Sequence, residues 1–210
     1  MDSTPVSQQD RALQLETLAR LLAENWMKIE IDSLYEAVDL AREAVQITSD
    51  VDLEWPTRVI SLGDLLFKRS IRLDRADDLK EALRCYYSAL SNDTISVPSY
   101  IEAGKMVLII LESSSNWEEL FRISRNLVYH IPGLVSHGLE NSDKQRALSQ
   151  SVGIASQAAA AALMVSEGPV MALQLLECTR GLISTSIDQA RVDIGEFLEG
   201  RPGLTDMGVL

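Results

Sequence analysis

The chain has 210 residues, of which 46% are hydrophobic and only 5% aromatic, a composition typical of a soluble helical domain. Its 31 acidic and 19 basic residues give a formal net charge of −12, which repels nucleic-acid phosphates and anionic lipid surfaces. We therefore expect neither nucleic acid nor a membrane among its partners.

The N-terminal segment 1–10 is polar and lacks the basic and then apolar pattern of a secretion signal. We interpret it as a disordered N-terminus and expect a cytoplasmic protein. The longest weakly polar run, 151–163, is shorter than the roughly 20 apolar residues that a membrane-spanning helix needs.

Helical periodicity runs through the rest of the chain, and no segment shows the alternation of a strand. Asn116 precedes two glutamates and predicts a helix N-cap, whereas the Pro132-Gly133 step predicts a helix end near Ile131. The predicted helices cover 8–28, 33–48, 56–72, 77–92, 98–113, 116–131, 143–166, 169–186 and 188–199.

The helices fall into pairs. In the first helix of each pair a small residue follows an apolar one, and these small residues are separated by 44, 41 and 49 residues, spacings typical of a solenoid. They are Ala19, Gly63, Gly104 and Gly153.

The second helices repeat as well, because the run from Asp32 to Val38 overlays the run from Asp77 to Leu83 at an offset of 45. The small residues Ala37, Ala41 and Ala44 then correspond to Ala82, Tyr86 and Ala89, which share one helix face. Two later copies, beginning at Trp117 and Val170, keep this spacing.

These patterns predict an all-α protein, a right-handed α-α superhelix of about four tetratricopeptide-like helix pairs plus a C-terminal helix. We expect the helical repeat domain to span 11–199, between the disordered 1–10 and a flexible tail at 200–210.

The sequence offers no catalytic constellation, so we expect no enzyme. His137-Gly138 resembles the His-Gly of a caspase-like site, but no strand precedes it and nothing places Cys85 or Cys178 near a base. A solvated turn explains the carboxylates at 74–78 without a metal ion. Glycine-rich phosphate loops are absent as well, so we predict no catalytic residue, no metal and no cofactor.

Two segments carry a family resemblance. The run from Asp32 to Val45, and Leu176-Glu177 with Arg180-Gly181 followed by Arg191-Val192-Asp193, resemble the tetratricopeptide region of fungal proteins that carry a CHAT domain. The likeness covers about residues 15–199. It implies a platform that precedes a caspase-like domain with a His/Cys protease pair, and it transfers no catalytic residue to this chain.

Two hypotheses follow. The first is a non-enzymatic protein–protein interaction scaffold, whose concave groove binds a protein or peptide, including a CHAT protease domain in cis or in trans. The alternative is a truncated regulatory or sensor region of a CHAT protease that lacks its catalytic domain. From positions relative to the small residues, the candidate groove residues are Asp64, Phe67, Lys68, Ile101, Lys105, Gln150 and Gln157.

Overall fold

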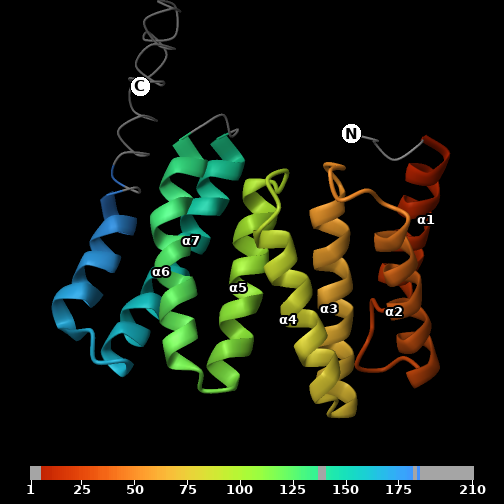
Figure 1. Ribbon diagram of the computed structural model, residues 1–210, viewed down its shortest axis with the longest axis horizontal. Helices are drawn as coiled ribbons and strands as arrows, with labels where there is room; N and C mark the ends of the chain where they lie inside the picture. The colour runs from red at the N-terminus through yellow and green to blue at the C-terminus, as the bar shows by residue number, and fades with distance from the viewer. Residues whose placement is uncertain (1–5, 137–140, 182–183, 185–210) are drawn as a thin grey trace, which may run out of the picture. The chain divides into compact units, whose positions relative to one another are not determined.

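The computed structural model describes residues 6–136, 141–181 and 184. Helices are the only regular secondary structure within these ranges, which confirms the all-α fold. Seven helices precede a further helical stretch at 168–181 (Figure 1). They are α1 (Val6–Leu22), α2 (Ile31–Gln46), α3 (Trp55–Leu73), α4 (Ala76–Leu90), α5 (Val97–Ser113), α6 (Trp117–Ser136) and α7 (Asn141–Met164).

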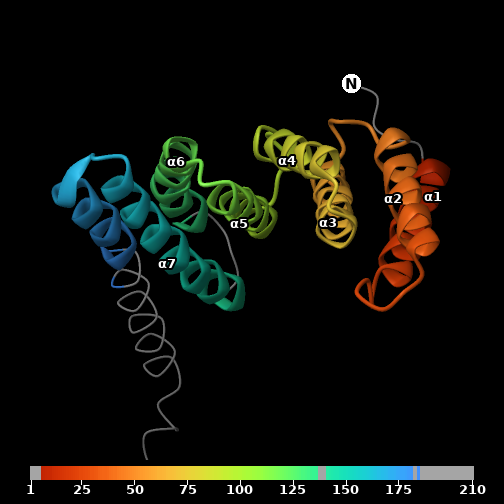
Figure 2. The ribbon, with the colours of Figure 1, turned by 90° about the horizontal axis from the view of Figure 1, so that it is seen from below.

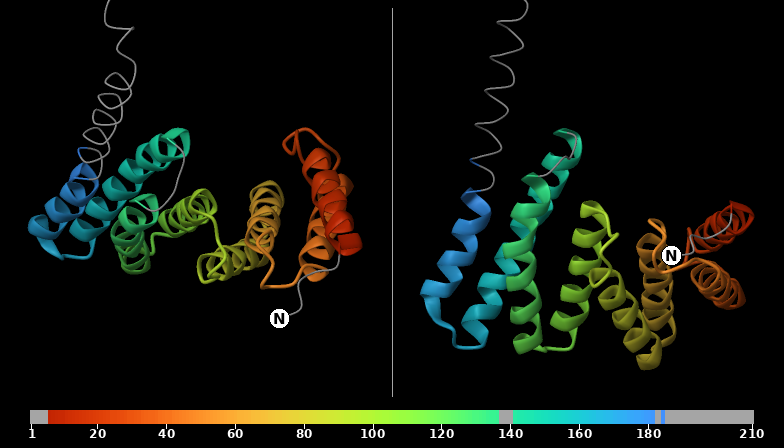
Figure 3. Two further views of the ribbon diagram at one scale, coloured as in Figure 1. Left: turned by 90° about the horizontal axis from the view of Figure 1, so that it is seen from above. Right: turned by 45° about the horizontal axis from the view of Figure 1, so that its top comes forward.

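The chain divides into two compact units, residues 1–123 and 124–210, and the boundary falls inside α6. In the first unit each helix from α1 to α4 packs on the next one along the chain. The views in Figures 2 and 3 agree that α1 lies beside α2, and α3 beside α4. The first helices of successive pairs, α1, α3 and α5, also contact one another in turn. This is the stacking of helix pairs that the repeat predicts.

The second unit also contains a helix pair. A short turn at 165–167 joins α7 to the stretch at 168–181, and the two lie side by side (Figure 2). The buried residues of the later stretch, Ala172, Leu175 and Thr179, follow the i, i+3, i+7 spacing of one helix face.

The repeated positions that share one face of α2 and α4 are all buried. Each is at most 1% exposed, so the repeated face is the one that packs against neighbouring helices. The set consists of Ala37, Ala41, Ala44, Ala82, Tyr86 and Ala89.

Gly63 makes room for the one large member of that set. A Cβ atom at Gly63 would lie 2.9 Å from Cε1 of Tyr86 and 3.0 Å from its Cζ, closer than such contacts normally allow. The equivalent positions in the first pair are Ala19 and Ala41, both buried. Two alanines at these positions in the first pair thus correspond to a glycine and a tyrosine in the second. The missing side chain of the glycine makes room for the ring of the tyrosine, so the two helices stay close together.

The fourth small residue of the repeat is not buried as the other three are. Gly153 is exposed, and a Cβ atom there would meet nothing within 4 Å. The buried stripe of α7 instead passes through the next residue, Ile154, and its members are Ala147, Ser151, Ile154, Ala158 and Ala161. Helical spacing explains the error, because a shift of one residue turns the side chain by about 100°.

Several helix ends differ from the predictions. Where a first helix to residue 28 was expected, α1 ends at Leu22. The guanidinium of Arg72 donates to the carbonyl oxygens of Trp26 and Ile29, which stabilises a turn there. At the other end α1 begins at Val6, inside the segment predicted to be disordered.

The predicted break at Pro132 is wrong, because α6 continues to Ser136. A proline in a helix removes one backbone hydrogen bond, but Leu127, Val128 and Ile131 just before it are all buried. Their burial holds this part of α6 in place. The start of α6 was predicted correctly: the side-chain oxygen of Asn116 accepts from the backbone N–H of Glu119 at 3.3 Å. The predicted helix at 188–199 and the tail at 200–210 lie outside the described residues.

Candidate functional site

All seven candidate groove residues lie on the first helices of the pairs, α3, α5 and α7. Asp64, Phe67 and Lys68 are half-exposed on α3, and Lys105 is half-exposed on α5. All four belong to the first unit. Gln157 is half-exposed on α7, in the second unit, and the side chain of Gln150 lies outside the described part of the chain.

Ile101 does not belong to this surface, because it is fully buried. It shares the inward face of α5 with Gly104 and Leu108, at the i, i+3, i+7 spacing. The exposed residue next to it is Glu102, which the sequence analysis missed. Glu102, Lys105 and Ile109 follow the i, i+3, i+7 spacing, which could have indicated that they share the face of α5 that is not buried.

Asp64 lies at the junction of α3, α4 and α5. The hydroxyl of Tyr86, a side chain from α4, donates to its Oδ1 at 2.7 Å. Burial raises the pKa of Asp64 above its ordinary value of 3.8; the Tyr86 hydrogen bond opposes this shift, Glu102 adds to it, and Lys68 opposes it. Asp64 therefore retains a proton more readily than a carboxyl in water.

The α1 and α3 helices are joined by polar contacts near the start of α3. The hydroxyl of Ser61 donates to Oε1 of Glu16 at 3.1 Å, and Oε2 of Glu16 lies 3.6 Å from Nε of Arg58. Arg58 is buried and also donates to Oγ1 of Thr48 at 3.2 Å. Side-chain contacts thus join the first helices of the first two pairs, α1 and α3.

The second helices are linked in their own row. Arg42 of α2 donates to Glu81 of α4 at 2.9 Å, and Tyr87 of α4 donates to Glu119 of α6 at 2.9 Å. Each junction therefore pairs a donor on one helix with a glutamate on the next. The hydrogen bond from Arg122 lowers the pKa of Glu119. Burial opposes this shift, and the hydrogen bond from Tyr87 adds to it.

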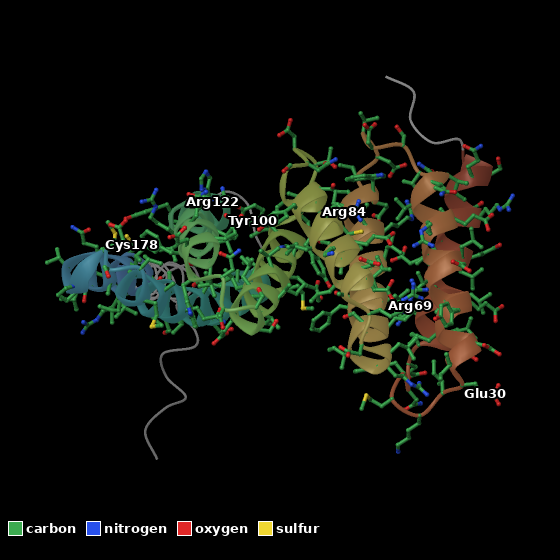
Figure 4. All side chains as sticks on the ribbon, turned by 60° about the horizontal axis from the view of Figure 1, so that its bottom comes forward. Glu30, Arg69, Arg84, Tyr100, Arg122 and Cys178 are labelled. Atoms are coloured by element: carbon green, nitrogen blue, oxygen red, sulfur yellow. The ribbon has the colours of Figure 1, made fainter. Side chains whose placement is uncertain are left out.

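A buried ion pair fixes α3 to α4. The guanidinium of Arg69 donates to both carboxylate oxygens of Asp78, at 2.7 and 2.8 Å, and both side chains are almost completely buried. Its Cζ also lies 4.9 Å from the ring centroid of Tyr35 on α2. Figure 4 shows Arg69 between α3 and α2. Asp78 is thus a packing residue and not part of a solvated turn, which corrects that interpretation of the carboxylates at 74–78.

No metal-binding group of three His, Cys, Asp or Glu residues occurs in the part of the chain that the structure describes. Burial raises the pKa of the Cys85 thiol to about 11, and Glu81 adds to the shift, so this thiol stays protonated at neutral pH. His130 is exposed, and its Nδ1 lies 2.8 Å from the carbonyl oxygen of Asn126. His137 lies outside the described residues.

Comparison with known proteins gave no match to a family model, a curated protein or a solved structure. No helix among the described residues is both long and apolar enough to cross a membrane. The candidate site is the surface of α1, α3 and α5, which carries half-exposed side chains of mixed chemistry.

Proposed function

We propose that the chain is a non-enzymatic scaffold that binds a protein or peptide segment on the surface formed by α1, α3 and α5. One observation carries the proposal: Lys68 and Lys105, on contacting helices, are half-exposed, and neither forms an ion pair within the described residues. Phe67, which precedes Lys68 in α3, is also half-exposed. Charge and apolar area together suit an extended surface for a segment of another protein.

A displayed library of random peptides, selected on the full chain, supplies probes for this surface. We predict that the double variant Lys68→Ala, Lys105→Ala binds the selected peptides about tenfold less tightly than the natural chain does, as expected when central contacts are removed. The melting temperature should stay unchanged, because neither lysine holds another part of the fold. Fluorescence anisotropy measures the affinity and circular dichroism the melt.

The matched control is Lys28→Ala with Lys80→Ala, which removes the same charge. Lys28 lies in the exposed turn after α1, and Lys80 is exposed on α4, where it pairs with Asp77 at 3.6 Å. Equal weakening by both double variants would show that only net charge matters. Loss of binding together with a lower melting temperature would make the two lysines structural.

A second candidate function rests on the stretch at 168–181. Val170, Leu173 and Leu176 are exposed on one side of this helix, so a partner surface would bury them. Here too lie Leu176-Glu177 and Arg180-Gly181, the segment that resembles the CHAT-associated region. We propose as the alternative that the chain is the regulatory part of a CHAT protease.

Long-read sequencing of the transcript beyond the codon for Leu210 tests this alternative. An open frame that encodes an α/β domain with a His/Cys pair would support it. A stop codon at that point, together with a monomeric chain in size-exclusion chromatography, would count against it and favour the independent scaffold.

A further inference from the structure

One stripe of α3 packs against α2, the second helix of the preceding pair. Its members follow the i, i+4, i+7, i+11 spacing of one helix face: Arg58, Leu62, Leu65 and Arg69. All four are buried. The first arginine donates to Oγ1 of Thr48, just after α2, at 3.2 Å, and Cζ of the last lies 4.9 Å from the ring centroid of Tyr35 on α2. The two leucines between them therefore face α2 as well.

The corresponding stripe of α1 is open. The offset of 44 between the first two pairs places Leu18 and Leu21, which form this open stripe, at the positions of the two leucines in α3. Those of α3 are at most 5% exposed, whereas Leu18 is 45% and Leu21 is 56% exposed. The side of α1 that packs inward carries alanine at its most buried positions, Ala12 and Ala19. Leucine outside and alanine inside is the reverse of an ordinary surface helix, which indicates that a further helix covers the open stripe.

The third first helix, α5, follows the same rule as α3. An offset of 41 places Ala103, Met106 and Ile110 on the equivalent stripe. Ala103 and Ile110 are buried and Met106 is half-exposed, and α5 packs on α4, the second helix before it. In the first unit, each first helix that comes after a second helix therefore has this stripe mostly covered. α1 comes before the second helices of this unit, and its leucines remain exposed.

The stretch at 168–181 is a second helix that exposes the other side of such a contact. In α2, Val38 follows the buried Ala37, lies between the two residues that contact the stripe of α3, and is fully buried. Leu173 and Leu176 each follow a buried residue in the same way, which turns them by about 100° from the buried face of this stretch. They are 61% and 40% exposed, so none of the described helices covers this side.

We infer that the chain binds copies of itself head to tail, with the stretch at 168–181 of one copy packed on the open stripe of α1 in the next. This contact repeats the one between α2 and α3, in which a second helix covers the leucines of the following first helix. The interface is heterologous, because it joins two different surfaces, so a pair of copies leaves one surface of each kind free for a third copy. The inference goes beyond the proposed function, since neither surface includes Lys68 or Lys105.

Sedimentation equilibrium of the full chain tests the inference over about a hundredfold range of concentration, because small interfaces are weak. We expect the average mass to rise with concentration above the 23.2 kDa of one copy. Added salt should raise it further, because each copy carries a net charge of −12 and screening reduces the repulsion between copies.

Two double variants, each altered at one surface, give the sharper test. Leu18→Gln with Leu21→Gln changes the open stripe, and Leu173→Gln with Leu176→Gln changes the stretch at 168–181. All four side chains are exposed, so the helix content and melting temperature from circular dichroism should be preserved. Each variant alone should be monomeric. An equal mixture should form a dimer that grows no further, because it contains one intact surface of each kind.

The matched control is Leu13→Gln with Met27→Gln, which removes two apolar side chains that are 57% and 66% exposed. The offset of 44 matches these positions with Thr57 and Ile71 of α3, which are exposed although α2 packs on that helix. The control variant should therefore associate as the natural chain does.

A natural chain that stays monomeric over the whole range would overturn the inference. Association of the variant altered at Leu173 and Leu176 would overturn it too, because two open stripes would then be meeting each other. A mixture of the two variants that stays monomeric would have the same meaning. The library peptides test the proposed function separately, since their dependence on Lys68 and Lys105 does not require that copies of the chain associate.

Discussion

Gly63 and Tyr86 carry much of the packing between α3 and α4. Because the ring of Tyr86 fills the space where a Cβ atom would lie, we predict that Gly63→Ala lowers the free energy of unfolding by about 1–3 kcal/mol, the usual cost of overpacking. Gly153→Ala is the control, since its Cβ would meet nothing within 4 Å. That variant should gain about 0.5–1 kcal/mol from helix propensity. Urea unfolding measures both, and a stabilised Gly63→Ala would show that Tyr86 moves aside freely.

Asp64 makes stability depend on pH. Its pKa is raised in the folded protein, mainly by burial, so the protonated form is favoured by folding. The resulting stability is fully present below the unfolded pKa of 3.8 and is lost as the pH rises through the higher folded pKa. We predict that Asp64→Asn, which can still accept from Tyr86, removes this dependence.

Urea titrations of both proteins from pH 3 to pH 8 measure the effect. The free energy of unfolding of the natural chain should fall relative to that of Asp64→Asn as the pH increases. Parallel curves would mean that Asp64 has the same pKa in the folded and unfolded chains.

Only part of this residue-level detail could be predicted from the sequence. The overlay of Tyr86 on Ala41 identified a shared buried position, because helical spacing fixes which residues share a face. It could not place Asp64 against Tyr86, since that hydrogen bond depends on how α3 and α4 are rotated. Ile101 and Glu102 show the same limit: one residue decides which of them is buried.

The helix pair α3 and α4 depends on Arg69 and Asp78. We predict that Arg69→Met costs about 3–5 kcal/mol, because it leaves a buried carboxylate without its bidentate partner. Nε of Arg75 lies 3.5 Å from Oδ2 of Asp78. Because this second cation remains, the loss of stability should be near the lower end of that range. The control Lys80→Met breaks the exposed pair with Asp77 and should cause no measurable change.

Denaturant unfolding of Arg69→Met and the double variant Arg69→Met, Asp78→Leu distinguishes the cause. Recovery of most of the lost stability in the double variant would show that the unpaired Asp78 charge was responsible. If the double variant is as unstable as the single one, the loss comes from contacts of Arg69 with Tyr35 and its surroundings.

At the scale of elements, the sequence predicted the helices and their order well, because hydrophobic periodicity is a local signal. Their ends were less accurate where distant residues decide them. The turn after α1 depends on Arg72, which lies more than 40 residues away in the chain. Continuation of α6 past Pro132 depends on the burial of the residues before it, which a local rule for proline does not include.

The whole molecule consists of two compact units, and stability in repeat proteins is largely the sum of each repeat and its contacts with neighbours. A defect in α3 and α4 should therefore spread to α2 and α5, which pack on them, and become weaker further along the chain. We predict that Arg69→Met increases amide hydrogen exchange in α3 and α4 and, to a smaller extent, in α2 and α5, while α7 keeps the protection it has in the natural chain.

Hydrogen exchange with mass spectrometry checks this prediction peptide by peptide, and Lys80→Met again supplies the control. Equal loss of protection in α7 would show that the two units unfold as one cooperative body. Such coupling would also extend the effect of ligand binding, because a ligand on α1, α3 and α5 would then stabilise the second unit as well as the first. With independent units, the same ligand should protect the first unit alone.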